Sequence, residues 1–263
     1  MDLGLQGKSV IVLAASKGLG KATAKQFATE GAHVLISSRN KEELQKTRDE
    51  IRSETGNNHV EYTVCDITVA QSVKELVSKA VELYGTVDIL INNAGGPPAG
   101  IFDKVDDRDW QNAFELNLLS FVRAIREVLP HMRNHGSGHI INLASSSIKQ
   151  PIDNLILSNT FRAGMVGFSK SLSQELAQDN ILINTIGPGR IATDRVAHLD
   201  NVKAEKLNIA YEEVKSQSEK SIPMGRYGTP EEFANMVVYL CSSANTYITG
   251  QSLLVDGGMV KAL

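Results

Sequence analysis

Ser145, Ser158 and Arg162 are residue types that could do chemistry together. Ser158 follows Ser145 by thirteen residues and Arg162 follows Ser158 by four, so on a helix the latter two share one face. A serine hydroxyl can hydrogen-bond a ligand, and arginine can stabilise negative charge that develops on an oxygen. Neither donates a proton readily, since serine is a weak acid and arginine has a pKa above about 12. The set therefore predicts binding and electrostatic stabilisation more than acid–base catalysis.

The composition is that of an ordinary soluble globular protein. The chain has 263 residues, 42% hydrophobic and 22% charged, enough for one large α/β domain. A net charge of -3 gives no long-range attraction to nucleic acids or acidic membranes. Cys65 and Cys241 are interpreted as buried thiols in a reducing cytoplasm, and no apolar run is long enough to span a membrane. We expect a cytoplasmic protein without nucleic-acid or membrane partners.

Short apolar runs alternate with amphipathic, helix-like segments along the whole chain. They predict strands at residues 10–13, 33–37, 60–65, 87–91, 139–143, 181–186 and 252–255. Capping patterns predict helix starts at Asn40 with Glu43, Thr68 with Gln71, and Thr229 with Glu232. This alternation predicts an α/β fold: a three-layer, doubly wound, Rossmann-like parallel sheet of about seven strands, forming one domain over residues 1–263. Ligands of such sheets bind beyond the carboxyl ends of the strands.

The turn after the first predicted strand carries Gly18, Leu19 and Gly20. Glycines there let backbone amides approach a pyrophosphate, and the start of the following helix favours negative charge. Arg39 follows the second strand, where an acid would favour NAD(H) and a cation suits the 2′-phosphate of NADP(H). Lys17 adds a second positive charge. The sequence therefore favours NADP(H) over NAD(H).

Several motifs make the chain resemble the short-chain dehydrogenase/reductase family over essentially its whole length. The family pattern Thr-Gly-x-x-x-Gly-x-Gly reads Leu-Ala-Ala-Ser-Lys-Gly-Leu-Gly at residues 13–20, so Leu13 and Ala14 replace Thr and the first Gly. Asn-Asn-Ala-Gly is intact at residues 92–95, and Asn117 matches the Asn of the active-site tetrad. The Pro-Gly motif follows the sixth strand at residues 187–193, and residues 248–251 and 255–258 match the closing strand.

The resemblance implies hydride exchange between a nicotinamide cofactor and a carbonyl or alcohol group. It implies catalytic positions at Asn117, Ser145, Ser158 and Arg162. The implied cofactor-binding residues are Ala14, Ser16, Lys17, Gly18, Leu19, Gly20, Arg39, Asp66, Ile67, Asn93, Ala94, Gly95, Arg162, Pro188, Gly189, Ile191 and Thr193. No metal site is implied.

The chain departs from the family at the tetrad itself. The family has a Tyr thirteen residues after the Ser, and a Lys four beyond it that lowers the pKa of the Tyr and binds the nicotinamide ribose. Ser158 and Arg162 stand there instead, and no Tyr lies between Ser145 and Arg190. Three hypotheses remain open: an NADP(H)-dependent oxidoreductase of the 3-oxoacyl or ketone type that uses water or another acid, an NADP-binding sensor or partner subunit with little turnover, or an isomerase or lyase.

Other features receive a weaker functional interpretation. Lys149 and Asp153 could supply the missing acid–base group, although loop surface charges explain them better. His131, His135 and His139 recur every fourth residue, but the glycines at 136 and 138 break the helix between the last two, so we expect no metal. Residues 195–221 stand at the family's substrate-lid position. The family also implies a homo-oligomer, either a dimer or a tetramer, acting on a small-molecule substrate.

Overall fold

One parallel sheet organises the protein, and the computed structural model describes it over residues 2–262. The 7-stranded sheet has the order β3-β2-β1-β4-β5-β6-β7, and each neighbouring pair is parallel. The strands are β1 (Ser9–Val12), β2 (His33–Ser38), β3 (Val60–Val64), β4 (Ile89–Asn92), β5 (Gly138–Leu143), β6 (Ile181–Pro188) and β7 (Ser252–Val255). The chain order reverses between β1 and β4, which is where a doubly wound sheet binds its ligand.

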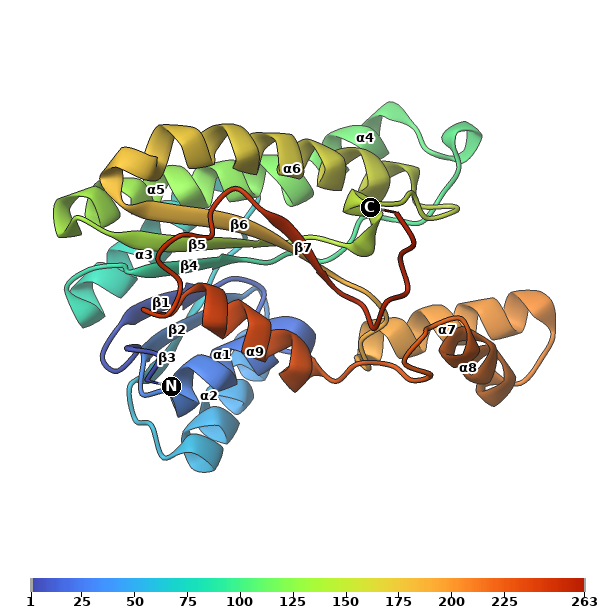
Figure 1. The fold of residues 1–263 in the computed structure, drawn as a ribbon, viewed down its shortest axis with the longest axis horizontal. Coiled ribbons are helices and arrows are strands. Elements are labelled where there is room, and N and C mark those ends of the chain that lie inside the picture. The colour runs from blue at the N-terminus through green and yellow to red at the C-terminus, as the bar shows by residue number, and fades with distance from the viewer. Residues whose placement is uncertain (1, 263) are drawn as a thin grey trace.

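Helices cover both faces of this sheet (Figure 1). One layer holds α1 (Gly18–Thr29), α2 (Lys41–Thr55) and α9 (Pro230–Leu240), and the other holds α3 (Ala70–Tyr84), α5 (Ser120–His135) and α6 (Ile156–Leu176). The remaining helices, α4 (Asp107–Phe114), α7 (Asp194–Leu207) and α8 (Tyr211–Lys220), lie toward one end of the molecule. The predicted three-layer Rossmann-like fold is confirmed.

The alternation of side chains along β1 explains why the sheet carries two separate cores. Val10 and Val12 belong to the core shared with α1 and α9, whereas Ile11 and Leu13 belong to the core shared with α3 and α5. All four side chains have an exposed fraction of 0%. A strand buried on both faces reads as a continuous apolar run, which is the pattern that the sequence shows.

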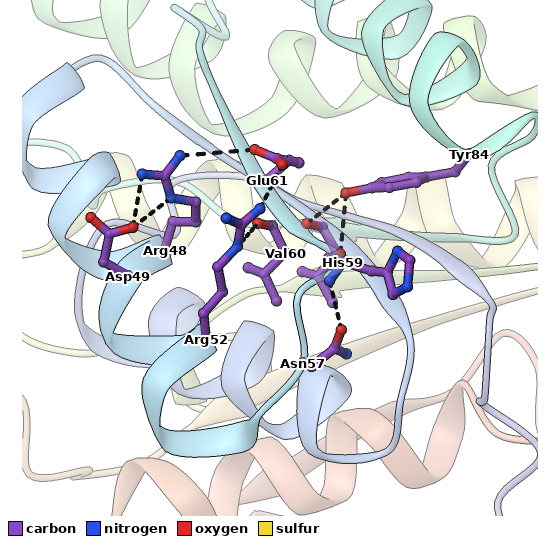
Figure 2. A network of polar contacts seen from close by, with 9 residues as sticks. Arg48, Asp49, Arg52, Asn57, His59, Val60, Glu61 and Tyr84 are labelled. Carbon is purple, nitrogen blue, oxygen red and sulfur yellow. Dashed lines mark hydrogen bonds and ion pairs between the residues drawn. The ribbon is translucent and has the colours of Figure 1, made fainter.

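Polar side chains of α2 and α3 contact the edge strand β3 and its neighbour β2, as Figure 2 shows. Arg52 donates from Nε to the carbonyl of Val60 at 2.8 Å and from Nη2 to Glu61 at 2.5 Å. At the end of α3, the hydroxyl of Tyr84 lies 3.2 Å from the carbonyls of Val34 and His59, and burial raises the pKa of this phenol. These contacts fix both helices to the sheet and occupy backbone groups near its open edge.

A buried chain of polar side chains joins β4, β5 and β6 to α6. Asn92 donates to Asn142 at 2.8 Å, Asn142 donates to Ser169 at 2.8 Å, and Thr185 donates to Ser169 at 3.0 Å. All four side chains are at most 2% exposed, so they depend on one another for hydrogen bonds. The chain fixes α6 against the strands from which the predicted site residues emerge.

Most local predictions are confirmed, with one exception. Asn40 and Thr229 cap α2 and α9. The capping box predicted for Thr68 and Gln71 is wrong: α3 begins at Ala70 without a side-chain cap, because the hydroxyl of Thr68 donates to Asp66 instead. Within residues 2–262, no helix is long and apolar enough to cross a membrane.

Replacing Asn142 with alanine tests the buried polar chain. Asn142→Ala leaves Asn92 and Ser169 short of a buried partner, so the free energy of unfolding should fall by about 1–3 kcal/mol in urea denaturation. Asn112→Ala, at an exposed position of α4, is the matched control and should change stability little. Equal stability of the two variants would contradict a structural role for these buried hydrogen-bonded side chains.

Candidate active site at the carboxyl edge of the sheet

The predicted site residues follow the strands directly and therefore gather at one edge of the sheet. Residues 14–20 follow β1, Arg39 follows β2, Asp66 and Ile67 follow β3, and residues 93–95 follow β4. Ser145 follows β5, and Pro188 to Thr193 close β6 and lead to α7. Because every strand is parallel, all these positions lie at the same end of the sheet.

The glycine turn leaves space and an open helix start for a phosphate. Gly18 has φ +57°, a backbone conformation that glycine adopts readily. A Cβ atom added at Gly20 would lie 2.6 Å from the carbonyl oxygen of Ala14, so only glycine fits there. The N-cap Lys17 makes no side-chain cap, and the first turn of α1 holds no acid. Free amides and an uncompensated helix dipole fit the pyrophosphate of a dinucleotide cofactor.

Ala14 adopts a conformation that its side chain disfavours. Its φ is +47°, in the left-handed region, and its carbonyl accepts a hydrogen bond from Nδ2 of Asn93 at 3.1 Å. The turn after β1 is therefore tied to the motif after β4. An alanine here adopts, at some cost, the backbone that a glycine would adopt freely.

The end of the site formed by β2 and β3 combines a cation with an acid. Arg39 is exposed, and Asp66 accepts hydrogen bonds from the amide and hydroxyl of Thr68 at 3.0 and 2.7 Å. The Thr68 hydroxyl and, more weakly, nearby Arg39 lower the pKa of Asp66. Ser16, predicted to face the cofactor, points its hydroxyl toward Glu43 at 3.3 Å. Ile67 is 8% exposed and packs into the core beside α3.

A short π-helix positions Asn117. The residues Glu115–Leu119 form this π-helix between α4 and α5. The Nδ2 of Asn117 donates to the carbonyl of Gly95 at 2.8 Å, and its Oδ1 has no hydrogen-bond partner among the described residues. The side chain is 0% exposed. A buried unpaired carbonyl suits an ordered water or a ligand donor.

Ser145 lies just after the end of β5, where Gly187 of the neighbouring strand β6 packs closely against its backbone. Its hydroxyl accepts a hydrogen bond from the amide of Ser147 at 3.2 Å, and the side chain is partly exposed. A Cβ atom added at Gly187 of β6 would lie 2.5 Å from the carbonyl oxygen of Ser145, so glycine is needed for this close approach. Lys149 and Asp153, in the following loop, are both exposed.

Ser158 and Arg162 lie on the buried face of α6, as their spacing predicts. Their exposed fractions are 8% and 4%. Arg162 donates from Nη1 to the carbonyl of Leu143, the last residue of β5, at 2.6 Å. Its Nε has no hydrogen-bond partner, and no carboxylate among residues 2–262 forms an ion pair with it. Burial lowers the pKa of Arg162 to about 10, so the side chain remains a cation at neutral pH.

The start of α7 covers the cofactor turn. Thr193 caps α7, and a Cβ atom added at Gly18 would lie 3.9 Å from Cγ2 of Thr193. Further along the helix, buried Asp200 accepts hydrogen bonds from Arg190 at 2.5 Å and from the hydroxyl of Tyr227 at 2.7 Å. This carboxylate anchors α7 to the segments that follow β6 and precede α9.

Comparison with known proteins agrees with this arrangement. A family model described as "Enoyl-(Acyl carrier protein) reductase" matches residues 13–260. The chain is 38% identical over 261 residues to a 3-oxoacyl-[acyl-carrier-protein] reductase, FabG, of Chlamydia pneumoniae, covering 98% of this chain and 99% of that one. The chain belongs to the short-chain dehydrogenase/reductase family. The family prediction is thus confirmed, and with it the prediction of an oxidoreductase.

Solved structures of the family share the whole architecture. L-sorbose reductase from Gluconobacter frateurii, complexed with NADPH and L-sorbose, has a TM-score of 0.95 and 33% identity, with 100% of both chains covered. An actinorhodin polyketide ketoreductase with NADPH has a TM-score of 0.91 and 33% identity, covering 96% of this chain and 97% of that one.

Two residues near the site were not singled out from the sequence. Ser38 ends β2 beside Arg39, and its buried Oγ has no partner among the described residues. A hydroxyl next to a predicted phosphate-binding cation was the available signal. Arg195, in the first turn of α7, lies against the loop after β4, since a Cβ atom added at Gly96 would be 3.6 Å from its Nη2. Only the folded chain places these two segments together.

Replacing Ala14 with glycine should relieve the strained turn. Because Ala14 has a positive φ, Ala14→Gly should raise the free energy of unfolding by up to about 1 kcal/mol, measured by urea denaturation. Ala15→Gly, at a buried neighbour with negative φ, should lower it instead. The same sign for both variants would contradict strain at residue 14.

Replacing Arg162 with methionine tests whether its buried charge lowers the stability of the protein. The pKa of Arg162 is lower in the folded chain than in the unfolded chain, so the buried charge reduces stability at neutral pH, and this penalty fades as pH rises through about 10. Arg162→Met should therefore raise the melting temperature at pH 7, even though Leu143 loses one donor.

The matched control for that prediction is Arg108→Met, at an exposed position of α4, which should change the melting temperature little. A clear fall for Arg162→Met would instead assign Arg162 a structural role.

Proposed function

We propose that this protein is an NADPH-dependent reductase of a ketone or 3-oxoacyl substrate, with Ser158 and Arg162 in the positions where the family has Tyr and Lys. The observation that carries the proposal is the gathering of Asn117, Ser145 and Arg162 at the strand ends beside an open glycine turn. The spacings of thirteen and four residues support the assignment of the two replaced positions.

The cofactor is NADP(H) rather than NAD(H), as the cation Arg39 indicates. Solved relatives that match the whole chain hold NADPH. The amides at the start of α1 and Lys17 would hold the pyrophosphate, and Arg39, next to Ser38, would hold the 2′-phosphate. Thr193 would hold the nicotinamide end. When bound, the cofactor supplies a hydride.

The side chains of this chain provide orientation and charge stabilisation. Ser145 and Ser158 donate hydrogen bonds to the substrate oxygen, and Arg162 stabilises the negative charge that forms on it. The Oδ1 of Asn117 has no partner among the described residues, and a water bound there would relay a proton from bulk solvent to complete the alcohol. Because neither Ser158 nor Arg162 is a competent acid near neutral pH, proton delivery should limit the rate.

A second candidate follows from that same weakness. Ser158 is a poorer acid than tyrosine, and Arg162 keeps its proton, so the protein could bind NADPH and a ligand yet turn over little, as a sensor or partner subunit. An isomerase or lyase using this pocket is the third candidate. A reductase converts its substrate while oxidising NADPH, an isomerase or lyase converts it without oxidising NADPH, and a sensor or partner subunit converts little or none.

We assign the remaining properties in keeping with the family. The protein acts in the cytoplasm as a single domain, and residues 195–221, which include most of α7 and α8, serve as its substrate lid. It forms a homo-oligomer. A partly exposed aromatic group on α4 and α6 supports this, since Phe161 packs against Trp110 at 5.8 Å and Phe114 at 6.1 Å between ring centroids, and Phe114 is 37% exposed.

Assays of NADPH binding and oxidation test the proposed function. The protein should bind NADPH, followed by its fluorescence, and oxidise it with at least one member of a panel of 3-oxoacyl thioesters, ketones and quinones. Ser145→Ala should lower kcat by about 10²–10³-fold through loss of one donor to the substrate oxygen, without weakening NADPH binding.

The control is Ser171→Ala, at an exposed position of α6, which should leave both measurements unchanged. NADPH binding without oxidation across the panel would favour the sensor or partner subunit. An isomerised or cleaved product without NADPH oxidation would favour the third candidate.

A further inference from the structure

Arg195 is an exposed cation beside the loop after β4, and it has no ion-pair partner among residues 2–262. It lies in the first turn of α7. Its Nη2 would lie 3.6 Å from a Cβ atom added at Gly96. The guanidinium thus extends from α7 across to the loop that follows β4.

The placement of this cation is electrostatically unfavourable for the helix. The first turn of a helix carries the positive end of the dipole, where acids stabilise and cations destabilise. Asp194, beside Arg195, is the acid that this turn supplies. A cation directed away from its own helix toward a ligand site is suited to bind an anion.

The neighbouring contacts define which part of the site Arg195 faces. Gly96 follows Gly95, whose carbonyl accepts the hydrogen bond from Asn117. Consecutive Cα atoms are about 3.8 Å apart, so Arg195 contacts the chain one residue away from the peptide that Asn117 holds. Asn117 is fully buried, and the catalytic position that the family assigns to it therefore lies close to this part of the loop after β4.

The phosphates of the cofactor do not require Arg195. The phosphates of the cofactor already have the open start of α1, Lys17 and Arg39. Two residues before Arg195, Thr193 lies against Gly18, so α7 passes from the cofactor turn toward the loop after β4. Arg195 therefore contacts the loop after β4, whereas Thr193 contacts the cofactor turn.

We infer that Arg195 determines specificity by binding a carboxylate that lies within a few bonds of the reacting carbonyl, so that the substrate is a small oxo acid. This rests on the proposed reductase function and narrows its substrate class. Arg195 contacts the loop one residue from the peptide that holds the catalytic Asn117, so an anion at Arg195 fits a short substrate better than the distant end of a long acyl chain. The buried anchor at Asp200 holds α7 and so fixes the position of Arg195.

Matched acid and ester probes test this inference. In NADPH oxidation, Arg195→Gln should raise the KM for 2-oxobutanoate or 3-oxobutanoate at least tenfold and change the KM for the corresponding methyl ester less than twofold. Arg195→Lys should recover part of the loss. Lys74→Gln, which removes an exposed cation of α3 far from the proposed lid, is the control and should behave as the unaltered protein.

Binding to the NADP⁺-loaded protein, measured by calorimetry, makes the test independent of turnover, because no hydride is available. A tenfold weaker binding of the acid by Arg195→Gln, with no turnover in any variant, supports the role of Arg195 and rejects the proposed reductase. Equal weakening of acid and ester overturns the inference. So does an equal loss of affinity for NADPH, which would assign Arg195 to the cofactor phosphates, and so does failure of the unaltered protein to bind either acid.

Discussion

The buried guanidinium of Arg162 is the interaction around which the site is arranged. A cation removed from water needs compensation, yet among residues 2–262 its side chain makes a single hydrogen bond, to the end of β5, and its Nε has no partner. The structure holds this charge because α6 is fixed from elsewhere, through Ser169 and the asparagines of β4 and β5. The hydrogen bonds of these buried side chains thus offset the unfavourable burial of the Arg162 charge. That charge lies where we propose that negative charge develops on the substrate. This separation of supporting and reacting groups is typical of functional sites.

Close backbone packing sets the geometry at both ends of the site. Gly187 allows β6 to approach the carbonyl of Ser145, and Gly20 allows α1 to approach Ala14 and Asn93. Any side chain at either glycine would displace backbone atoms, which cannot move aside as a flexible side chain alone could. The site is therefore built on closely packed strand ends.

The sequence predicts the fold almost completely, because the seven apolar runs and the helical stripes between them are local signals. It also places the strand-end residues correctly at one edge, since a parallel sheet leaves them no other position. Thr68 was misread because a hydroxyl can cap a helix or bond a nearby carboxylate, and only the loop geometry decides between them. Arg195 could not be recognised, because its neighbour Gly96 is distant in sequence and a glycine gives no pattern of its own.

The anchor at Asp200 divides α7 into two faces with different freedom to change. The face that carries Asp200 is committed to Arg190 and Tyr227, and a substitution there would release the helix from the body of the protein. The other side chains of α7 take no part in these contacts, so they can be substituted while the helix stays in place. Because a single buried carboxylate holds α7 in place, related chains can change the other residues of this helix, and with them the substrate, while the sheet stays the same.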